Sequence, residues 1–376
     1  PSGPRFKIIP DSELVYGPPS VIFHLFAFVR EKNGYLASYR ETLDEQIYTG
    51  AEVIQRVARE QSVNPRLLLA VLEYQSGWVT EANPLHTPLE APMGNSDSWR
   101  TGLYLQLAWA GNELNRGFNQ FKNGWIGSWL LVDGSVVPVD ATINPGTAGI
   151  QQLMARLHNR SGWEKAVGTQ GVYDVYYRLF GYPFDYSLDP LVPPGLTQPE
   201  MQLPFEEYTV WSFTGGPHGG WGDGAPWAGL DFAPPGSGFG CILSYDWVTA
   251  AARGLVVRSE LGVVVVDLDG DGFEQTGWSV LYLHIATDDR VKIGTYVEAG
   301  DHIGHPSCEG GVSSGTHVHI ARRYNGEWIA ADGDVPFVLD GWTAESSGVA
   351  YNGILKREGQ VVEAWDRVVE ENQISR

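Results

Sequence analysis

The first half of the chain spaces its hydrophobic residues with the period of an α-helix. Thr49 and Glu52 have the spacing of a capping box, and the apolar residues after them recur at helical intervals. Asn64 and Pro65 have the pattern of a helix start, an N-cap residue followed by proline at the first helical position. The run that follows, 66–74, is apolar on all sides, which is typical of a helix in the centre of a domain. Further helices are expected near 103–115, 147–158 and 172–180.

The second half changes to short runs with β-type patterns, separated by glycine-rich turns. These runs predict strands at 254–257, 262–268, 280–284 and 316–321. Between the halves, five prolines lie in the segment 189–204, where they disfavour both a helix and a central strand. We therefore predict a multidomain α+β protein with a mainly helical domain at 1–188, a Pro-rich linker at 189–204 and a mainly antiparallel β-sheet domain at 205–376.

Composition excludes several classes of protein. The chain has 376 residues, of which 43% are hydrophobic, and this is enough apolar material for two cores. The formal net charge of −20 disfavours a nucleic-acid binder, which needs a basic face. No apolar run is long enough to span a membrane. The opening residues lack the pattern of a signal peptide, which says little about the compartment in which the protein works.

Histidines are concentrated in the β-type half, where they could form a metal site. His317 and His319 alternate along one predicted strand, so their imidazoles should lie on one face, about 7 Å apart. His284 ends another strand, and His218 and Asp231 lie upstream. Two imidazoles and one carboxylate suffice to hold a catalytic Zn²⁺ with an open position for water. Additional imidazoles can take a proton and stabilise an oxyanion.

The order of these motifs resembles the lysostaphin/LytM-type zinc endopeptidases, and their β-lytic, staphylolysin-like branch in particular. The resemblance extends from about Trp211 to Trp328 and includes the runs 229–233, 252–254, 281–284, 297–304 and 308–319. It implies one catalytic Zn²⁺ and a peptidase fold built on an antiparallel sheet.

Carried over position by position, the resemblance implies that zinc is bound by His218, Asp231 and His319. It implies that His317 is the general base and that His284 stabilises the tetrahedral intermediate.

Two positions depart from the pattern of the family. Most relatives have their first ligand four residues before the aspartate, where this chain has Trp227, so His218 fits only the long-loop branch and Asp223 is the fallback. Some relatives also use a tyrosine beyond the H-x-H motif to assist the oxyanion. No tyrosine here matches it clearly, and Phe337 lies in that region.

The run 63–78 resembles the active-site helix of lysozyme-like lytic transglycosylases. The catalytic glutamate of that family is Gln75 here, and an amide cannot supply the proton that a glycosidic oxygen needs. Glu73 lies nearly opposite on the helix and cannot replace it. The first domain is therefore expected to be a degenerate lysozyme-like module that is not catalytic. A module that holds glycan, one that shapes the peptidase cleft and a pure scaffold all remain open.

Two smaller features allow alternative interpretations. Asp267, Asp269 and Asp271 form the first half of a calcium loop, but the twelfth position is Trp278 rather than glutamate, so a solvated hairpin tip and an improvised Ca²⁺ site are both open. Cys241 and Cys308 are the two cysteines of the chain. They form either one disulfide or two buried free thiols.

Together these features predict a secreted or surface zinc metalloendopeptidase that hydrolyses peptide cross-links of bacterial peptidoglycan, with glycine-containing bonds favoured by resemblance. The alternative is a non-catalytic wall-binding or regulatory protein with the same fold. The expected partner is peptidoglycan or a glycine-rich peptide, with no nucleic acid and no membrane span. The sequence leaves the oligomeric state open and favours a monomer, located outside the cell or at its surface.

Overall fold

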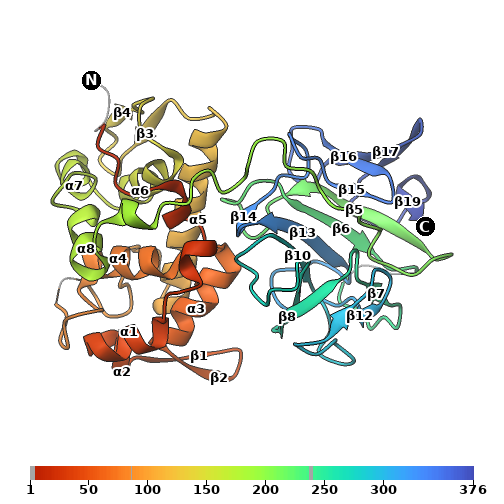
Figure 1. Ribbon diagram of the computed structural model, residues 1–376, viewed down its shortest axis with the longest axis horizontal. Coiled ribbons are helices and arrows are strands. Elements are labelled where there is room, and N and C mark those ends of the chain that lie inside the picture. The colour runs from red at the N-terminus through yellow and green to blue at the C-terminus, as the bar shows by residue number, and fades with distance from the viewer. Residues whose placement is uncertain (1–4, 86, 237–239) are drawn as a thin grey trace. The chain divides into compact units, whose positions relative to one another are not determined.

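The computed structural model describes residues 5–85, 87–236 and 240–376, and its contacts divide the chain into two units. Unit 1 is Pro1–Leu191 together with Gly222–Ala225, and unit 2 is Val192–Trp221 together with Pro226–Arg376. Figure 1 shows helices dominating unit 1 and strands dominating unit 2. Among the described residues, no helix combines the length and apolar character needed to cross a membrane.

The described part of unit 1 is built mainly of helices (Figure 1). It also contains two short hairpins and three 3₁₀ turns. The helices are α1 (Leu25–Lys32), α2 (Tyr35–Ser38), α3 (Gly50–Gln61), α4 (Pro65–Ser76), α5 (Leu103–Lys122), α6 (Pro145–Ala155), α7 (Arg160–Ala166) and α8 (Val172–Phe180). The hairpins pair β1 (Arg40–Leu43) with β2 (Gln46–Thr49), and β3 (Ser128–Leu130) with β4 (Val136–Pro138). The 3₁₀ turns are η1 (Asp11–Glu13), η2 (Pro18–Ser20) and η3 (Pro183–Tyr186).

The starts of α3 and α4 follow from local sequence. Thr49 and Glu52 form a reciprocal capping box at α3, and the side chain of Asn64 accepts a hydrogen bond from the backbone N–H of Arg66 at α4. Helix α4 is buried from Pro65 to Leu72, as its apolar sequence predicts. The expected helix near 103–115 continues to Lys122, because its apolar stripe continues past Leu114 to Phe118.

Unit 2 contains one large antiparallel sheet in which neighbouring strands follow the order β11-β8-β9-β10-β13-β6-β5-β19, with β14 paired to β13. Its strands are β5 (Val210–His218), β6 (Gly229–Ala233), β8 (Gly254–Glu260), β9 (Val263–Asp267), β10 (Trp278–Leu283), β11 (Tyr296–Val297), β13 (Val318–Tyr324), β14 (Glu327–Trp328) and β19 (Gln373–Ser375). A smaller sheet joins β15 (Val338–Leu339), β16 (Trp342–Ser346), β17 (Gly353–Arg357) and β18 (Gln360–Glu363), while β7 (Val248–Thr249) pairs with β12 (His302–Gly304). The 3₁₀ turn η4 (Glu370–Asn372) precedes β19.

The central strands of the large sheet are covered on both faces. Every residue of β6 and β9 is buried, so these strands lack the alternation of a half-exposed strand. The core beneath them contains Phe205, Trp211, Phe213 and Phe232, with the rings of Phe205 and Trp211 stacked 5.1 Å apart. This rigid, two-sided core fixes the central strands on which the candidate site residues lie.

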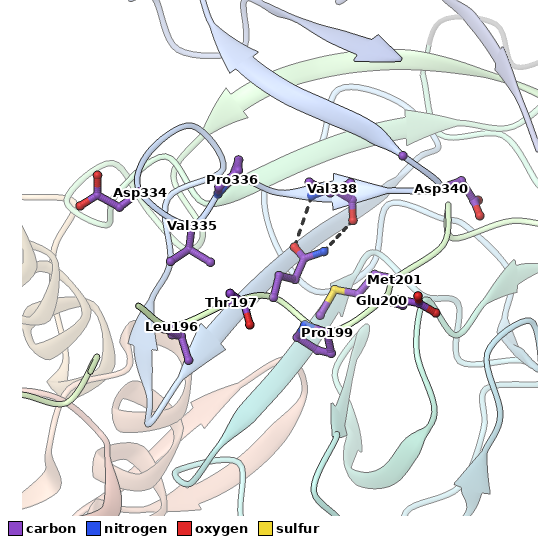
Figure 2. A pocket seen from close by; sticks show the side chains of 12 residues that line it. Leu196, Thr197, Pro199, Glu200, Met201, Asp334, Val335, Pro336, Val338 and Asp340 are labelled. Carbon is purple, nitrogen blue, oxygen red and sulfur yellow. Dashed lines mark hydrogen bonds between the residues drawn. The ribbon is translucent and has the colours of Figure 1, made fainter. Parts of the chain in front are cut away.

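The Pro-rich segment is attached at both of its ends. The carboxylate of Asp189 accepts hydrogen bonds from the backbone N–H groups of Asp11 and Ser12 in unit 1. In unit 2 the amide of Gln198 donates to the carbonyl of Val338 at 2.7 Å and accepts from its N–H at 3.3 Å, as the dashed lines in Figure 2 show. A cavity of about 560 Å³ lies between residues 196–201 and 334–341 (Figure 2), and no candidate site residue lines it.

Candidate active site

Three side chains from adjacent strands converge on one point of unit 2. Asp231 on β6 is directly opposite His319 on β13, and His218 ends β5, the other neighbour of β6. The Oδ1 atom of Asp231 is 3.0 Å from Nδ1 of His319 and 3.3 Å from Nε2 of His218, and these two nitrogens are 2.9 Å apart. All three residues are buried. They form a group that could hold a metal ion.

Two glycines make this close approach sterically feasible. A Cβ atom at Gly229 would lie 2.1 Å from Cε1 of His319, and one at Gly215 would lie 2.4 Å from Oδ2 of Asp231. The β5–β6 pair is also irregular, with register shifts between Phe213 and Gly215 and between Gly215 and His218. Such irregularities re-aim side chains at a strand end, and here they bring His218 to the same point as Asp231.

His218 and His319 each have one ring nitrogen that points away from the trio, and a backbone carbonyl binds it. Nδ1 of His218 donates to the carbonyl of Gly216 at 2.8 Å, and Nε2 of His319 donates to the carbonyl of Gly220 at 3.2 Å. A neutral imidazole has a single N–H. The inner nitrogens, Nε2 of His218 and Nδ1 of His319, therefore present lone pairs to each other and to Asp231. Three electron-rich atoms at these distances repel one another unless a cation lies among them, and this donor set fits Zn²⁺.

The pKa shifts of the three residues also favour a cation at this point. Burial by itself raises the pKa of Asp231, but the neighbouring histidines, His218 first, outweigh it and hold this pKa well below its ordinary value. Burial lowers the pKa of His218, yet the Asp231 carboxylate raises it overall, while burial keeps the pKa of His319 lowered. The site therefore favours a positive charge beside Asp231.

Two more histidines lie next to the trio, just outside the strands in which they were predicted. Strand β13 begins at Val318, so His317 precedes it, and β10 ends at Leu283, so His284 follows it. The rings of His317 and His284 are 4.5 Å apart, and Nε2 of His317 is 3.8 Å from Oδ1 of Asp231. The predictions that His284 lies within the strand 280–284 and His317 within the strand 316–321 were therefore wrong. The φ of His284 is 67°, in the left-handed region, so its backbone is not extended.

Both of these imidazoles are also oriented by backbone carbonyls. Nδ1 of His317 donates to Gly315 at 2.7 Å, and Nδ1 of His284 donates to Glu309 at 2.8 Å. Burial, followed by the charges of His317 and His319, lowers the pKa of His284 to about 3. His284 is thus a neutral imidazole at physiological pH. The structure brings all five candidate residues together.

Comparison with known proteins shows what each half of the chain is similar to. Residues 226–331 match the model of Peptidase family M23, and residues 7–192 match that of the LasA N-terminal domain. Protease LasA of Pseudomonas aeruginosa is 27% identical over 364 residues, covering 86% of this chain and 75% of that protein. The β-lytic metalloendopeptidase of Achromobacter lyticus is 28% identical over 160 residues, 40% of each chain.

The chain is a metalloendopeptidase. A solved structure described as a novel M23 metalloprotease, pseudoalterin, from the deep sea is 25% identical and covers 46% of this chain and 99% of that one, with a TM-score of 0.38. The match in the N-terminal half is to the LasA N-terminal domain, and the lysozyme-like interpretation gains no support from it. His218 lies outside the matched segment 226–331.

The metalloendopeptidase has a tyrosine at the site that the sequence did not identify. Tyr351 lies in the turn between β16 and β17 and stacks on the ring of His218, with centroids 4.1 Å apart and planes 20° apart. Its carbonyl accepts from the N–H of Gly216, and its N–H donates to the carbonyl of Pro217. Phe337, the residue considered from sequence, is fully buried and packs against Arg322 in the core. Only the pairing of the β16–β17 turn with 216–217 reveals Tyr351.

Asp223, the fallback ligand, binds residues of helix α5 and not the trio. It belongs to unit 1, where its Oδ1 accepts a hydrogen bond from Asn112 at 2.6 Å and pairs with Arg116 at 2.9 Å. These contacts occupy its carboxylate.

In unit 1, helix α4 carries the two residues considered for a glycosidase site, Gln75 and Glu73. Nε2 of Gln75 lies 3.2 Å from Nε2 of His158. The carboxylate of Glu73 accepts from the N–H groups of Val79 and Thr80 and from the Thr80 hydroxyl. Glu73 therefore anchors the turn that follows α4, and Gly77, with a φ of 71°, ends the helix.

The two remaining predictions concern the aspartate loop and the cysteines. The carboxylates of Asp267, Asp269 and Asp271 lie close enough together to hold a cation, but all three accept hydrogen bonds from their own loop. The hairpin-tip interpretation accounts for these contacts, and the calcium interpretation gains no support. Cys241 and Cys308 are joined by a disulfide, with Cα atoms 5.8 Å apart.

Proposed function

We propose that this metalloendopeptidase is a zinc enzyme of the lysostaphin type that cuts peptide cross-links in bacterial peptidoglycan. The single observation that carries the proposal is the convergence of His218, Asp231 and His319, whose inner donor atoms lie within 3.3 Å of one another. Bound there, Zn²⁺ would lower the pKa of a water molecule and polarise the scissile carbonyl.

The proposed general base is His317. Its Nδ1–H is occupied by the carbonyl of Gly315, so the lone pair of Nε2 is free to accept a proton on the side that faces Asp231. Nε2 can then return the proton to the leaving amine.

His284 and Tyr351 are proposed to bind the developing oxyanion. His284 lies beside His317, and the ring of Tyr351 is held against His218 by stacking. Tyr351 is 56% exposed as a residue. A phenol hydroxyl is a neutral donor that can stabilise negative charge as it develops.

Substrate and location rest on likeness to relatives. Similarity to Protease LasA and to β-lytic metalloendopeptidases supports a secreted or surface enzyme whose substrate is peptidoglycan or a glycine-rich peptide. The net charge of −20 repels anionic wall polymers at long range, so recognition must depend on short-range contacts with the peptide. The boundaries proposed for the peptidase domain are 205–376, after a linker at 189–204.

The N-terminal domain, 1–188, is proposed to be non-catalytic. Gln75 carries an amide, which cannot act as an acid, and the carboxylate of Glu73 accepts hydrogen bonds from the N–H groups of Val79 and Thr80. Retention of the three ligand residues and of both additional histidines argues against the alternative, a wall-binding or regulatory protein without activity.

The proposal is tested by zinc stoichiometry combined with hydrolysis of purified peptidoglycan and of a pentaglycine peptide. We expect about one zinc per wild-type chain, and His218→Ala should lose both the zinc and the lysis. His302→Ala is the matched control, because His302 is an exposed histidine paired with Glu206 and stacked on Trp247. A wild-type protein that stays free of zinc after supplementation would refute the proposal.

A further inference from the structure

His284 is held in an unfavourable backbone conformation by contacts from a distant segment. Its φ is 67°, a left-handed value that costs a non-glycine residue of order 1 kcal/mol. The carbonyl of His284 accepts hydrogen bonds from the N–H of Ser307 at 2.7 Å and from its hydroxyl at 3.0 Å. The Nδ1–H of its imidazole donates to the carbonyl of Glu309 at 2.8 Å. The orientation of this ring therefore depends on the segment 307–309.

The side chain of Glu309 also binds the loop that follows His284. Its Oε1 accepts a hydrogen bond from the N–H of Thr287 at 2.8 Å, and its Oε2 accepts one from the Thr287 hydroxyl at 2.6 Å. A more distant ion pair joins Oε2 to Arg290 at 3.9 Å. One residue thus fixes the imidazole of His284 through its carbonyl and the following loop through its carboxylate.

The segment that carries Glu309 is itself anchored. Cys308, the preceding residue, is joined to Cys241 by the disulfide. The N–H of Glu309 donates to the hydroxyl of Ser307, and the N–H of His317 donates to the carbonyl of Ser307. Residues 307–309 therefore link His284 to His317, the residue that precedes β13.

We propose that Glu309 is a positioning residue for peptide hydrolysis: its carboxylate clamps Thr287, and this clamp keeps the Glu309 carbonyl against the imidazole of His284. The inference rests on the proposed function, because it assumes that His284 acts in the reaction. Among the described residues, Glu309 makes its polar contacts with His284, Ser307, Thr287 and Arg290, so its effect on the reaction passes through His284.

Because the Glu309 side chain is partly exposed, its effect on the geometry of His284 can be distinguished from an effect on protein stability. The Glu309 side chain is 41% exposed, and a carboxylate this accessible contributes little to global stability through its charge. Its loss should therefore change the geometry of His284 more than it changes the unfolding transition. Catalytic geometry is sensitive to small shifts, and a misplacement of about 1 Å can cost roughly 100-fold in rate.

The test compares Glu309→Ala, Glu309→Gln, Thr287→Val and the double variant Glu309→Ala/Thr287→Val in the full chain. We expect Glu309→Ala to lower kcat roughly tenfold to 100-fold, with zinc content and KM unchanged. Thr287→Val should have a similar effect, and the double variant should be no worse than the poorer single variant, because both changes break one clamp. Glu309→Gln should recover much of the rate, since its amide can accept from the Thr287 N–H and donate to the hydroxyl.

Glu345→Gln is the matched control. Glu345 has a similar exposure of 44% and pairs with Lys356 in the smaller sheet, so its kcat should equal that of the wild type. Wild-type kcat in Glu309→Ala, or a loss of zinc that accompanies the loss of rate, would overturn the positioning role.

Nitrogen-15 NMR of the histidine side chains provides a readout that does not depend on activity. In the wild type, the proton of His284 should reside on Nδ1, and in Glu309→Ala this signal should shift or exchange faster. If the wild-type protein fails to hydrolyse any peptide, the proposed function fails, while the NMR comparison still tests the clamp. An unchanged His284 spectrum in Glu309→Ala would refute the clamp even in an active enzyme.

Discussion

Asp231 and His319 are cross-strand partners, opposite each other on β6 and β13, and Oδ1 of Asp231 lies 3.0 Å from Nδ1 of His319. Side chains at paired positions in neighbouring strands project to the same face a few ångströms apart. Two metal-binding groups are therefore fixed by sheet register alone, on strands buried along their whole shared length. His218, at the end of β5, completes the trio from the other side of β6.

His319→Ala should abolish zinc binding and lysis together. Removing this imidazole leaves two protein donors, too few for a catalytic zinc site, so activity should fall by more than about 100-fold. Elemental analysis and peptidoglycan hydrolysis measure the two effects in one preparation. Activity retained in this variant would show that the metal is bound elsewhere.

Gly229→Ala should weaken zinc binding although it adds only a methyl group. The new Cβ would lie 2.1 Å from Cε1 of His319, so the imidazole must shift from its position in the trio. We expect a loss of metal affinity of roughly tenfold to 100-fold, measured by competition with a chromogenic chelator. Gly333→Ala is the control for adding a methyl group to this unit, because among the described residues the atom nearest to its new Cβ would be Cβ of Ala330, at an ordinary contact distance of 3.8 Å.

Tyr351→Phe should lower kcat without removing zinc. The phenyl ring retains the stacking on His218, so the metal site should keep its geometry, while the hydroxyl proposed to assist the oxyanion is lost. Because His284 shares this role, we expect a loss of roughly tenfold to 100-fold. Equal kcat in the two proteins would remove Tyr351 from the mechanism.

Asp269→Asn should stabilise unit 2 at neutral pH. Burial, and then the neighbouring Asp269 and Asp271, raise the pKa of Asp267 to about 6. A carboxyl group whose pKa is raised by folding contributes stability below its unfolded value near 4, and this contribution is lost as pH rises through about 6. Removing the charge of Asp269 should bring the pKa of Asp267 closer to its ordinary value, so less stability is lost at neutral pH.

We therefore expect the Asp269→Asn variant to unfold about 1–2 °C above the wild type at pH 7. The difference should vanish below pH 4, where Asp267 is protonated in both folded and unfolded chains. Calorimetry at the two pH values measures it. A larger difference in unfolding temperature at acid pH would show that repulsion between Asp267 and Asp269 is not the cause.

Much of the site could be predicted from the sequence because its motifs are local. The order of the histidine and aspartate motifs from His218 to His319, and their resemblance to the lysostaphin/LytM-type endopeptidases, were sufficient to name the five candidate residues. The capping box at Thr49 and the apolar run of α4 likewise predicted two helices whose starts the structure reproduces. Short-range hydrogen bonds and side-chain periodicity determine such features, and both are encoded in adjacent residues.

Tertiary structure alone decided the rest. Tyr351 reaches His218 only because the β16–β17 turn pairs with residues 216–217, more than 130 positions away in the chain. The left-handed backbone of His284 and its link to Glu309 depend on a contact between segments 25 residues apart. Local sequence indicates which residues are able to bind a metal or move a proton. The packing of distant segments determines which of them meet, because each such meeting depends on the register of strands that are far apart in the chain.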